Sequence, residues 1–391
     1  MQGLGCFEAD RHGRLCYRPP VPPFPKLDEV WAQFRRADRA VAEFDQALAS
    51  FAVPEVVGKL FARWDAVESS GAEGTTTTFG DLLAFHSAPQ RVRDAEDARQ
   101  VAGVADAFDD LANDATPSFT EAALAIHRRL FARAGAGKLK TYPNGTYDPD
   151  APSGIFHFTA PDSTRAALAE WEAFTAASDD RPELVRQALS HWMFEHIHPL
   201  PDGNGRIGRL LVPLAMRRKG ASRQACAFLG EAVRREKAIH VEALKDTRRS
   251  GDPGPWTRLF CAMIAEGAIA NLDRLGRLGR VHARWRSALR GVRAHSVAHR
   301  LIPWVLTTPT FTLRDAMKAF GVSFQAIGTA VARLEAEGIV GRVDDAARNR
   351  VFSAPEVIGL FAPPPPWSED QREKPDHHQQ ADQKDHSDGS A

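Results

Sequence analysis

Apolar residues recur at intervals of three and four positions over much of the chain, which is the spacing of one face of a helix. The helices predicted from this spacing cover residues 28–48, 56–67, 163–174, 182–197 and 206–219. A further helix is predicted to follow Ser118, because Glu121 stands three positions later and completes a capping box. The pattern therefore predicts a mainly α-helical protein.

Two segments interrupt this helical pattern. Within residues 138–161, the sequence Tyr-Pro-Asn-Gly at 142–145 is a turn signal, and residues 154–159 alternate like a short strand. Residues 18–25 read Arg-Pro-Pro-Val-Pro-Pro-Phe-Pro, and proline lacks the N–H group that helices and sheets need. We therefore expect residues 1–27 to form an extended proline-rich lead-in, with neither helix nor strand from residue 17 onward.

Residues 301–361 form a unit of their own. Two apolar helix patterns lie on either side of Gly321, and two short apolar runs follow near Ile339 and Val351. Helix, turn, helix and a short hairpin are typical of a winged helix-turn-helix. Such a unit binds DNA in some proteins and docks other proteins in others, so both roles stay open. The polar residues that we expect on its outer surface are Gln325, Thr329, Arg333, Arg342, Arg348 and Arg350.

Changes in composition mark the remaining boundaries. Arginine recurs at helical spacing between residues 273 and 300, which predicts a solvated connector helix, with a partner-binding or phosphate-binding face as the alternative. The polar tail after four consecutive prolines should be disordered. The expected parts are a lead-in at 1–27, an N-terminal helical region at 28–115, a central core at 116–220, a helical extension and connector at 221–295, the winged unit at 296–361 and the tail at 362–391.

Composition places few restrictions on function. The chain has 391 residues, with 50 Lys and Arg against 50 Asp and Glu, so its net charge indicates neither a nucleic-acid nor a membrane partner. Its four cysteines form no CxxC pair, and no apolar run is long enough for a membrane span or a secretory signal. We therefore expect a cytoplasmic protein with reduced thiols and no membrane partner.

One stretch combines several groups that handle phosphate. Residues 198–209 read His-Pro-Leu-Pro-Asp-Gly-Asn-Gly-Arg-Ile-Gly-Arg and lead from one predicted helix into the next. Glycines before a helix N-terminus expose backbone N–H groups and make an anion-binding cradle. Arg206 and Arg209 share a face of the first turn and suit further phosphate oxygens. Positive side chains oppose the helix dipole at that end, which suggests that they are kept for an anion.

Two further residues complete this set. Asp202 is a hard oxygen ligand beside the cradle and suits phosphate-bound Mg²⁺. His198 carries an imidazole that can take a proton from a hydroxyl near neutral pH. Together these groups argue for phosphoryl or nucleotidyl transfer. The alternatives are a hairpin turn, which the helical flanks disfavour, and zinc bound by His191, His196 and His198, whose spacing fits no common zinc site.

Residues 198–209 resemble the signature of the Fic (Fido) family, His-Pro-Phe-x-Asp-Gly-Asn-Gly-Arg-x-x-Arg, and depart from it at Leu200. The resemblance implies a mainly α fold, a Fic-type helical bundle with a short β-hairpin flap, followed here by the winged-helix domain. It also implies transfer of AMP from ATP, with Mg²⁺, to a Ser, Thr or Tyr hydroxyl of a target protein.

The resemblance assigns roles residue by residue. His198 would be the general base and Asp202 would hold Mg²⁺. Gly203, Asn204 and Gly205 would line the anion hole, while Arg206 and Arg209 would bind the outer phosphates. The segment that resembles the flap, which would pin the target chain by strand-like pairing, comprises Gly154, Ile155, Phe156, His157 and Phe158.

A second resemblance lies upstream, at residues 69–74. The sequence Ser-Ser-Gly-Ala-Glu-Gly fits the family's inhibitory pattern of Ser or Thr, three free positions, Glu, and Gly or Asn. It implies that Glu73, in a motif that begins at Ser69, pairs with Arg209 and blocks the seating of the γ-phosphate; a helix end without such a role is the alternative. Gly71 and Ala72 depart from the residues usual in this helix and should weaken the inhibition.

The predicted function is thus an autoinhibited protein adenylyltransferase. His240 and Val241 stand where many relatives carry two tyrosines near the adenine, so strict preference for ATP stays open. A hydrolase that removes AMP through the same site, and a nucleotide-sensing DNA-binding regulator without turnover, are the alternatives. The expected partner is a protein with a hydroxyl side chain, while DNA at the C-terminal unit and a homodimer are left open.

Overall fold

The computed structural model describes residues 3–89, 92–112, 118–133, 135–151, 153–223, 228–293, 295–343 and 350–362. The tail from residue 363 onward, which the sequence predicts to be disordered, lies outside the described residues, as does Arg348. Within the described part of the chain, no helix is long and apolar enough to cross a membrane.

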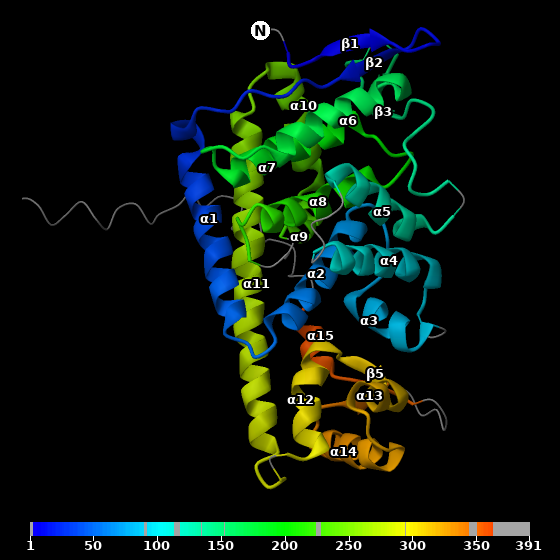
Figure 1. The fold of residues 1–391 in the computed structure, drawn as a ribbon, viewed down its shortest axis with the longest axis vertical. Helices are drawn as coiled ribbons and strands as arrows, with labels where there is room; N and C mark the ends of the chain where they lie inside the picture. The colour runs from blue at the N-terminus through cyan, green and yellow to red at the C-terminus, as the bar shows by residue number, and fades with distance from the viewer. Residues whose placement is uncertain are drawn as a thin grey trace, which may run out of the picture. The chain divides into compact units, whose positions relative to one another are not determined.

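Helices make up most of the described chain, as the sequence predicts (Figure 1). The long helices α1 and α11 run side by side along one flank, while nearly every residue of α7 and α8 is buried inside the bundle. The helices up to the C-terminal unit are α1 (Leu27–Ala49), α2 (Pro54–Gly71), α3 (Phe79–Ser87), α4 (Ala95–Ala112), α5 (Phe119–Phe131), α6 (Pro161–Ala176), α7 (Glu183–Ile197), α8 (Asn204–Arg218), α9 (Gly230–Arg235), α10 (Lys237–Ser250) and α11 (Gly254–Ala288).

The helix boundaries follow local chemistry that the sequence displays. α2 begins at Pro54, whose fixed φ suits the first turn of a helix. The side chain of Ser118 accepts a hydrogen bond from the N–H of Glu121, and the carboxylate of Glu121 accepts one from the N–H of Ser118. This reciprocal pair confirms the predicted capping box at the start of α5.

A four-stranded sheet of order β1-β2-β4-β3 joins the N-terminus to the predicted flap. β1 (Cys6–Ala9) and β2 (Leu15–Arg18) form an antiparallel hairpin, and β2 pairs in parallel with β4 (Ile155–His157). β4 pairs on its other side, antiparallel, with β3 (Gly145–Tyr147). The expectation of a lead-in without strands is therefore wrong at β2, and the predicted flap hairpin is half of a larger sheet whose open edge on the flap side is β3.

The C-terminal unit contains helices and a three-stranded sheet of order β5-β7-β6. Its predicted turn is present, because α13 ends at Gly321 in a left-handed conformation with φ of 63°. Phe361 packs against Phe61 and Phe79, with ring centroids 5.3 and 4.7 Å apart. The assignment as a winged helix, and DNA binding with it, stays a prediction. The elements are α12 (Val297–Thr307), β5 (Thr310–Thr312), α13 (Leu313–Phe320), α14 (Phe324–Ala336), β6 (Gly341–Arg342), β7 (Val351–Ser353) and α15 (Pro355–Gly359).

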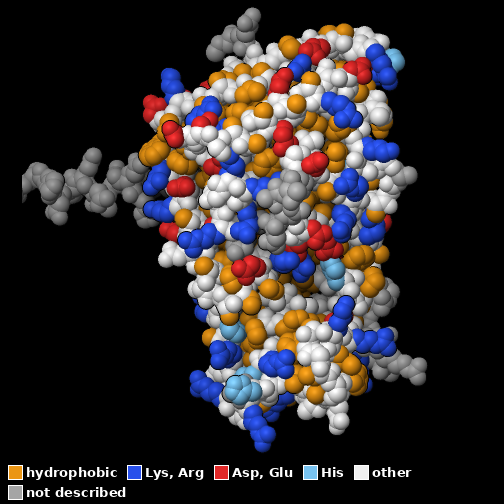
Figure 2. All heavy atoms as spheres, viewed as in Figure 1, with side chains coloured by type: hydrophobic (Ala, Val, Ile, Leu, Met, Phe, Trp, Pro, Cys, Tyr) orange, Lys and Arg blue, Asp and Glu red, His pale blue; other side chains and the backbone are white. Residues whose placement is uncertain are grey.

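Most of the recurring arginines lie on α11 and are exposed. Arg277, Arg280 and Arg286 all face solvent, as expected of a solvated connector. Lys and Arg side chains are also visible around the end of the molecule that holds the C-terminal unit (Figure 2). Arg274 is the exception, since it is buried and pairs with Glu231 at 2.8 Å.

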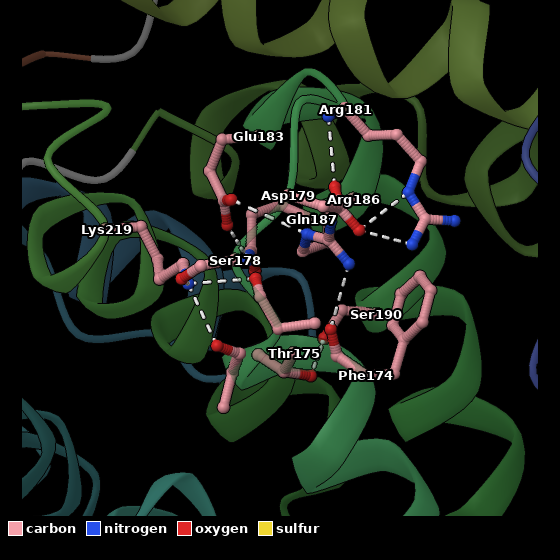
Figure 3. Close-up of polar contacts among 12 residues, drawn as sticks. Phe174, Thr175, Ser178, Asp179, Arg181, Glu183, Arg186, Gln187, Ser190 and Lys219 are labelled. Atoms are coloured by element: carbon pink, nitrogen blue, oxygen red, sulfur yellow. Dashed lines mark hydrogen bonds and ion pairs between the residues drawn. The ribbon is translucent and has the colours of Figure 1, made fainter.

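Polar contacts tie together the ends of α7 and α8 that lie away from the motif (Figure 3). The guanidinium of Arg186, near the start of α7, is 1% exposed, pairs with Asp179 and donates to the Phe174 carbonyl at 3.2 Å. Lys219, at the end of α8, donates to two carbonyls that end α6, each 2.9 Å away. Because a buried charge is stable only when it is paired, this cluster fixes the three helices against one another.

Candidate active site

His198 is the residue that ends α7. It adopts a left-handed conformation with φ of 49°, and its N–H donates to the carbonyl of Phe194 at 2.9 Å. This conformation is uncommon outside glycine, so the surrounding contacts must hold it. Its Nδ1 lies 3.0 Å from the carbonyl oxygen of Glu195. Because a carbonyl oxygen only accepts, Nδ1 carries the proton and Nε2 is left as the basic nitrogen.

The environment keeps this imidazole neutral at physiological pH. Burial lowers the pKa of His198 to about 4; the hydrogen bond to Glu195 opposes this effect and the charge of Lys140 adds to it. The ring also stacks on that of Phe158, with centroids 4.0 Å apart and planes 8° apart. Phe158 belongs to the predicted flap, so the structure brings the flap and the predicted base into contact.

Amide and ammonium groups fix the loop between α7 and α8. The side chain of Asn204 accepts from the N–H of Leu200 and donates to its carbonyl, both at 2.9 Å. The buried Lys140 donates to the Ile197 carbonyl at 3.0 Å and to the side-chain oxygen of Asn144 at 2.8 Å. Asn144 in turn donates to the Leu200 carbonyl at 2.8 Å. Asn204 therefore shapes the loop with its side chain, and only its backbone N–H is left for the predicted anion hole.

The start of α8 forms the predicted anion cradle. Gly203 is the N-cap with φ of 73°, and the first bond within the helix runs from the N–H of Ile207 to the Gly203 carbonyl at 3.1 Å. The N–H groups of residues 204–206 therefore have no partner within the helix. A Cβ at Gly205 would lie 2.7 Å from Oε1 of Glu73. The absence of a side chain at Gly205 thus lets an anion approach the helix end closely.

The two predicted phosphate-binding arginines are both buried but differ in their partners. Arg206 is 6% exposed, donates to Gln100 at 3.2 Å and lies near the ring of Phe131. Its Nε is buried with no hydrogen-bond partner in the described part of the chain. Among the described residues no carboxylate pairs directly with this buried guanidinium, although the charges of Asp202 and Glu73 act on it, so the arrangement suits a residue that receives an anionic ligand.

Arg209 is engaged by the predicted inhibitory motif. Its guanidinium donates to the side chain of Ser69 at 2.8 Å, to the Ser69 carbonyl at 2.9 Å and to Oε1 of Glu73 at 2.7 Å. The other carboxylate oxygen of Glu73 accepts from Lys237 at 2.9 Å. Burial raises the pKa of Glu73, but the charges of Arg209 and Lys237 outweigh it, and the pKa falls to about 2. The structure thus brings Ser69, Glu73 and Arg209 together as the resemblance implies.

Packing explains why a glycine stands at position 71, although it should weaken this helix. A Cβ at Gly71 would lie 2.8 Å from the guanidinium carbon of Arg234. That guanidinium pairs at 2.6 Å with Glu68, a carboxylate that is 2% exposed. The helix therefore loses some intrinsic stability at Gly71 but gains a buried ion pair beside it. Ala72 contributes its carbonyl, which accepts from Lys237 at 2.6 Å.

Most of the predicted site residues line one cavity of about 550 Å³, a size suited to a small-molecule ligand. The predicted residues that do not line it are Ser69, Gly154, Ile155 and His157. Asp202 lies at its exposed side, and its carboxylate accepts from the N–H of Gly203 at 2.6 Å. The described residues contain no group of three His, Cys, Asp or Glu placed to hold a metal ion. One carboxylate together with substrate phosphates is a usual arrangement for Mg²⁺, so Asp202 fits that ion. A larger cavity, of about 790 Å³, lies beside α13 and α14; none of the residues predicted for the phosphate-handling site lines it, whereas Arg342 and Arg350 of the C-terminal unit do.

A buried ion pair between the flap and α10 was not predicted. Asp148 is 1% exposed and accepts from Arg248 at 2.9 Å and from Arg249 at 3.4 Å. The Arg248 guanidinium also lies 4.2 Å from the ring centroid of Phe156. Phe156 is therefore buried, whereas its neighbour Ile155 is 47% exposed. Nothing in the local sequence links these residues, because the two partners of the ion pair are 100 positions apart.

Known sequences show which family this chain resembles. Residues 118–216 match the Fic/DOC family, and residues 31–110 match the Fic/DOC family N-terminal region. Protein adenylyltransferase fic-1 of Caenorhabditis briggsae is 34% identical over 104 residues, which cover 25% of this chain and 19% of that protein. The chain therefore matches only about a fifth of the length of this relative.

One solved structure shows the same fold, and a second is less similar. A Fic family protein from Desulfovibrio desulfuricans G20 superposes with a TM-score of 0.56 at 15% identity, covering 85% of this chain and 98% of that chain. A Fic-domain signalling protein from Bacteroides thetaiotaomicron reaches a TM-score of 0.48 at 17% identity, covering 61% of this chain and 95% of that chain. The first of these, with the helices described above, confirms the predicted Fic-type, mainly α fold.

Proposed function

We propose that this chain, which matches the Fic/DOC family at residues 118–216 and the N-terminal region of that family at residues 31–110, is a protein adenylyltransferase that moves AMP from ATP to a hydroxyl of a target protein. The observation that carries this proposal is one cavity lined by His198, Asp202, Arg206 and Arg209 at the N-terminus of α8. A base, a metal ligand and phosphate-binding cations in one pocket are what nucleotidyl transfer requires. The activity in the name of the nematode relative supports the same reaction.

In this reaction the target hydroxyl attacks the α-phosphorus of ATP, the bond from that phosphorus to the bridging oxygen breaks, and pyrophosphate leaves. Nε2 of His198 takes the hydroxyl proton, since the hydrogen bond at Nδ1 keeps the ring in the tautomer that can accept it. Arg206 and Arg209 bind the outer phosphates, and the free N–H groups of α8 bind oxygens beside them. Asp202 would hold Mg²⁺, whose charge offsets that of the phosphates.

The contact between Glu73 and Arg209 acts in this proposal as a brake. The carboxylate lies beside the N-terminus of α8 and pairs with Arg209 at 2.7 Å. A γ-phosphate would need the same guanidinium and the same cradle, so nucleotide can seat productively only after the carboxylate withdraws. The protein should therefore have low activity until Glu73 is displaced.

The target chain would pair with the open edge of β3. Because β2 and β3 flank β4, the backbone of β4 is already paired on both sides at His157. All three residues of β3 are exposed, and Gly145 and Thr146 line the cavity. An extended segment added at β3 would place its hydroxyl side chain near the cavity while its backbone hydrogen bonds give affinity without sequence preference.

Incubation with ATP labelled at the α-phosphate tests the proposal. We expect weak labelling of protein by the wild type, stronger labelling by Glu73→Gly, and none by the double variant Glu73→Gly/His198→Ala. Mass spectrometry should find added AMP on a Ser, Thr or Tyr. Equal labelling with and without His198 would exclude it as the base.

The same assay separates the two other functions considered. A hydrolase would remove AMP from a modified protein, and that removal would be lost in Glu73→Gly. A regulator without turnover would bind ATP yet transfer nothing in any variant at position 73. Either result would replace the proposed reaction.

A further inference from the structure

Lys237 is a second cation on the inhibitory carboxylate. It is the first residue of α10, and its Nζ donates to Oε2 of Glu73 at 2.9 Å and to the Ala72 carbonyl at 2.6 Å. Arg209 binds the other oxygen, Oε1, at 2.7 Å. The two cations therefore divide the carboxylate between them, and both line the same cavity as the anion cradle.

We propose that Lys237 changes partner, binding Glu73 in the inhibited state and the polyphosphate of the nucleotide once Glu73 has withdrawn. This inference rests on the proposed nucleotidyl transfer, and it adds a phosphate-binding residue on α10 that lies outside the motif at 198–209. The same side chain would then stabilise the brake in one state and the substrate in the other.

Geometry supports a shared ligand. The Glu73 carboxylate contacts both Arg209 and Lys237 and lies against the backbone of Gly205. An anion that takes its place in the cradle falls within reach of the same two cations. The ammonium of Lys237 sits on a flexible side chain that is 48% exposed, so it can follow a ligand larger than a carboxylate.

The position of Lys237 within its helix also supports a role in binding an anionic ligand. A cation in the first turn of a helix opposes the helix dipole, and α10 carries no acidic residue in that turn. Arg206 occupies an equally unfavourable place in the first turn of α8. Two helices thus begin with a cation at the same cavity, which suits a ligand with several negative charges.

Partner exchange predicts that one substitution has different effects in two backgrounds. In the presence of Glu73, Lys237→Met removes a tether of the brake and the later phosphate contact together, so the two losses offset and the dissociation constant of ATP·Mg²⁺ should change by less than about threefold. In Glu73→Gly, the same substitution removes a phosphate contact, so ATP·Mg²⁺ should bind about three- to tenfold more weakly. A residue that only supports the brake would have no effect in the second background.

Isothermal titration of the full-length protein with ATP·Mg²⁺ measures this difference between the two backgrounds. The variants are wild type, Lys237→Met, Glu73→Gly and the double variant. Lys59→Met is the matched control, because Lys59 is a half-exposed lysine on α2 that pairs with Asp109 outside the cavity. In the Glu73→Gly background, Lys237→Arg should keep most of the affinity, and thermal unfolding should show that each variant is folded.

Each outcome decides the question. Equal dissociation constants for Glu73→Gly with and without Lys237→Met overturn the inference, as does an equal loss with Lys59→Met. If Glu73→Gly binds ATP·Mg²⁺ but labels no protein, the proposed transfer reaction fails. The dissociation constants of Glu73→Gly with and without Lys237→Met still decide whether Lys237 binds the nucleotide. If no variant binds the nucleotide, both proposals fail.

Discussion

The strength of the brake can be tested by replacing Glu73 with glutamine. The substitution keeps the size of the side chain and removes its negative charge. In the structure the carboxylate is 29% exposed and receives hydrogen bonds from Arg209 at 2.7 Å and from Lys237 at 2.9 Å. The amide oxygen of glutamine can still accept from one of the two cations, but the NH2 group that replaces the other oxygen cannot accept, and the attraction of the cations for a neutral group is much weaker.

The pKa of Glu73 sets the size of the expected effect. It lies near 2 instead of the ordinary 4.5. Since one pKa unit corresponds to about 1.36 kcal/mol, the environment favours the carboxylate over the neutral acid by roughly 3 kcal/mol. Glutamine resembles the neutral acid, and its remaining hydrogen bonds retain part of the contact, so we expect the brake to weaken by about 2 to 3 kcal/mol, or roughly 30- to 150-fold.

Initial rates of AMP transfer at limiting ATP measure this effect. Glu55→Gln is the control, because Glu55 lies in the first turn of the same helix and is exposed. It should leave the rate unchanged, whereas Glu73→Gln should raise it. If Glu73→Gln labels protein at the wild-type rate while labelling still depends on His198, the carboxylate does not control access to Arg209.

The pH dependence of the brake follows from the direction in which the pKa of Glu73 is shifted. Because the pKa of Glu73 is lowered, the contribution of its charge is fully present above 4.5 and is lost only as the pH falls toward 2. The ratio of the Glu73→Gln rate to the wild-type rate should therefore be constant from about pH 6 to 9. A ratio that falls toward one within that range would contradict the conclusion that the charge of Glu73 maintains the brake.

Three further results are expected. Because the pKa of His198 is lowered to about 4, the rate of the Glu73→Gln protein should not show an acid limb near 6.5, and a pH–rate profile with that limb would refute a buried base. Asn204→Ala leaves the loop groups it bonds at 2.9 Å without partners and should lower the free energy of unfolding by about 1 to 3 kcal/mol in a denaturant titration. Lys140→Met removes the buried donor to the Ile197 carbonyl, so this substitution should lower kcat more than it raises KM for ATP. An unchanged kcat would show that the loop keeps its active conformation without Lys140.

Local sequence was sufficient wherever neighbouring residues decide the structure. The helical spacing of apolar residues predicted α5 to α8, and the capping box at Ser118 located the start of α5 correctly. The twelve residues at 198–209 predicted the resemblance to the Fic family, which the matches at residues 31–110 and 118–216 confirm. They also predicted a helix N-terminus beside a histidine, since both features arise within a single turn of chain.

Contacts between distant segments were missed. The pairing of β2 with β4 joins Cys16 to His157, and no local pattern announces a strand in a proline-rich lead-in. One local contact was missed as well, since the side-chain amide of Asn204 bonds the backbone of Leu200 only four residues away. Lys140 looks like any other lysine in the sequence and becomes a loop-fixing donor only because burial leaves its ammonium no water to bind.

By itself, then, the sequence determined the helices on either side of the motif, the resemblance to the Fic family and the residues able to carry phosphate chemistry, because spacing along a helix and the order of side chains within a short motif are local properties. The tertiary structure decided which of those residues already has a partner. It brings Glu73 across the bundle to Arg209, leaves Arg206 without a charged partner among its described contacts, and sets Lys237 on the same carboxylate. Such pairings depend on how helices pack, since the strength of a charge contact is set by distance and burial in space and not by separation along the chain.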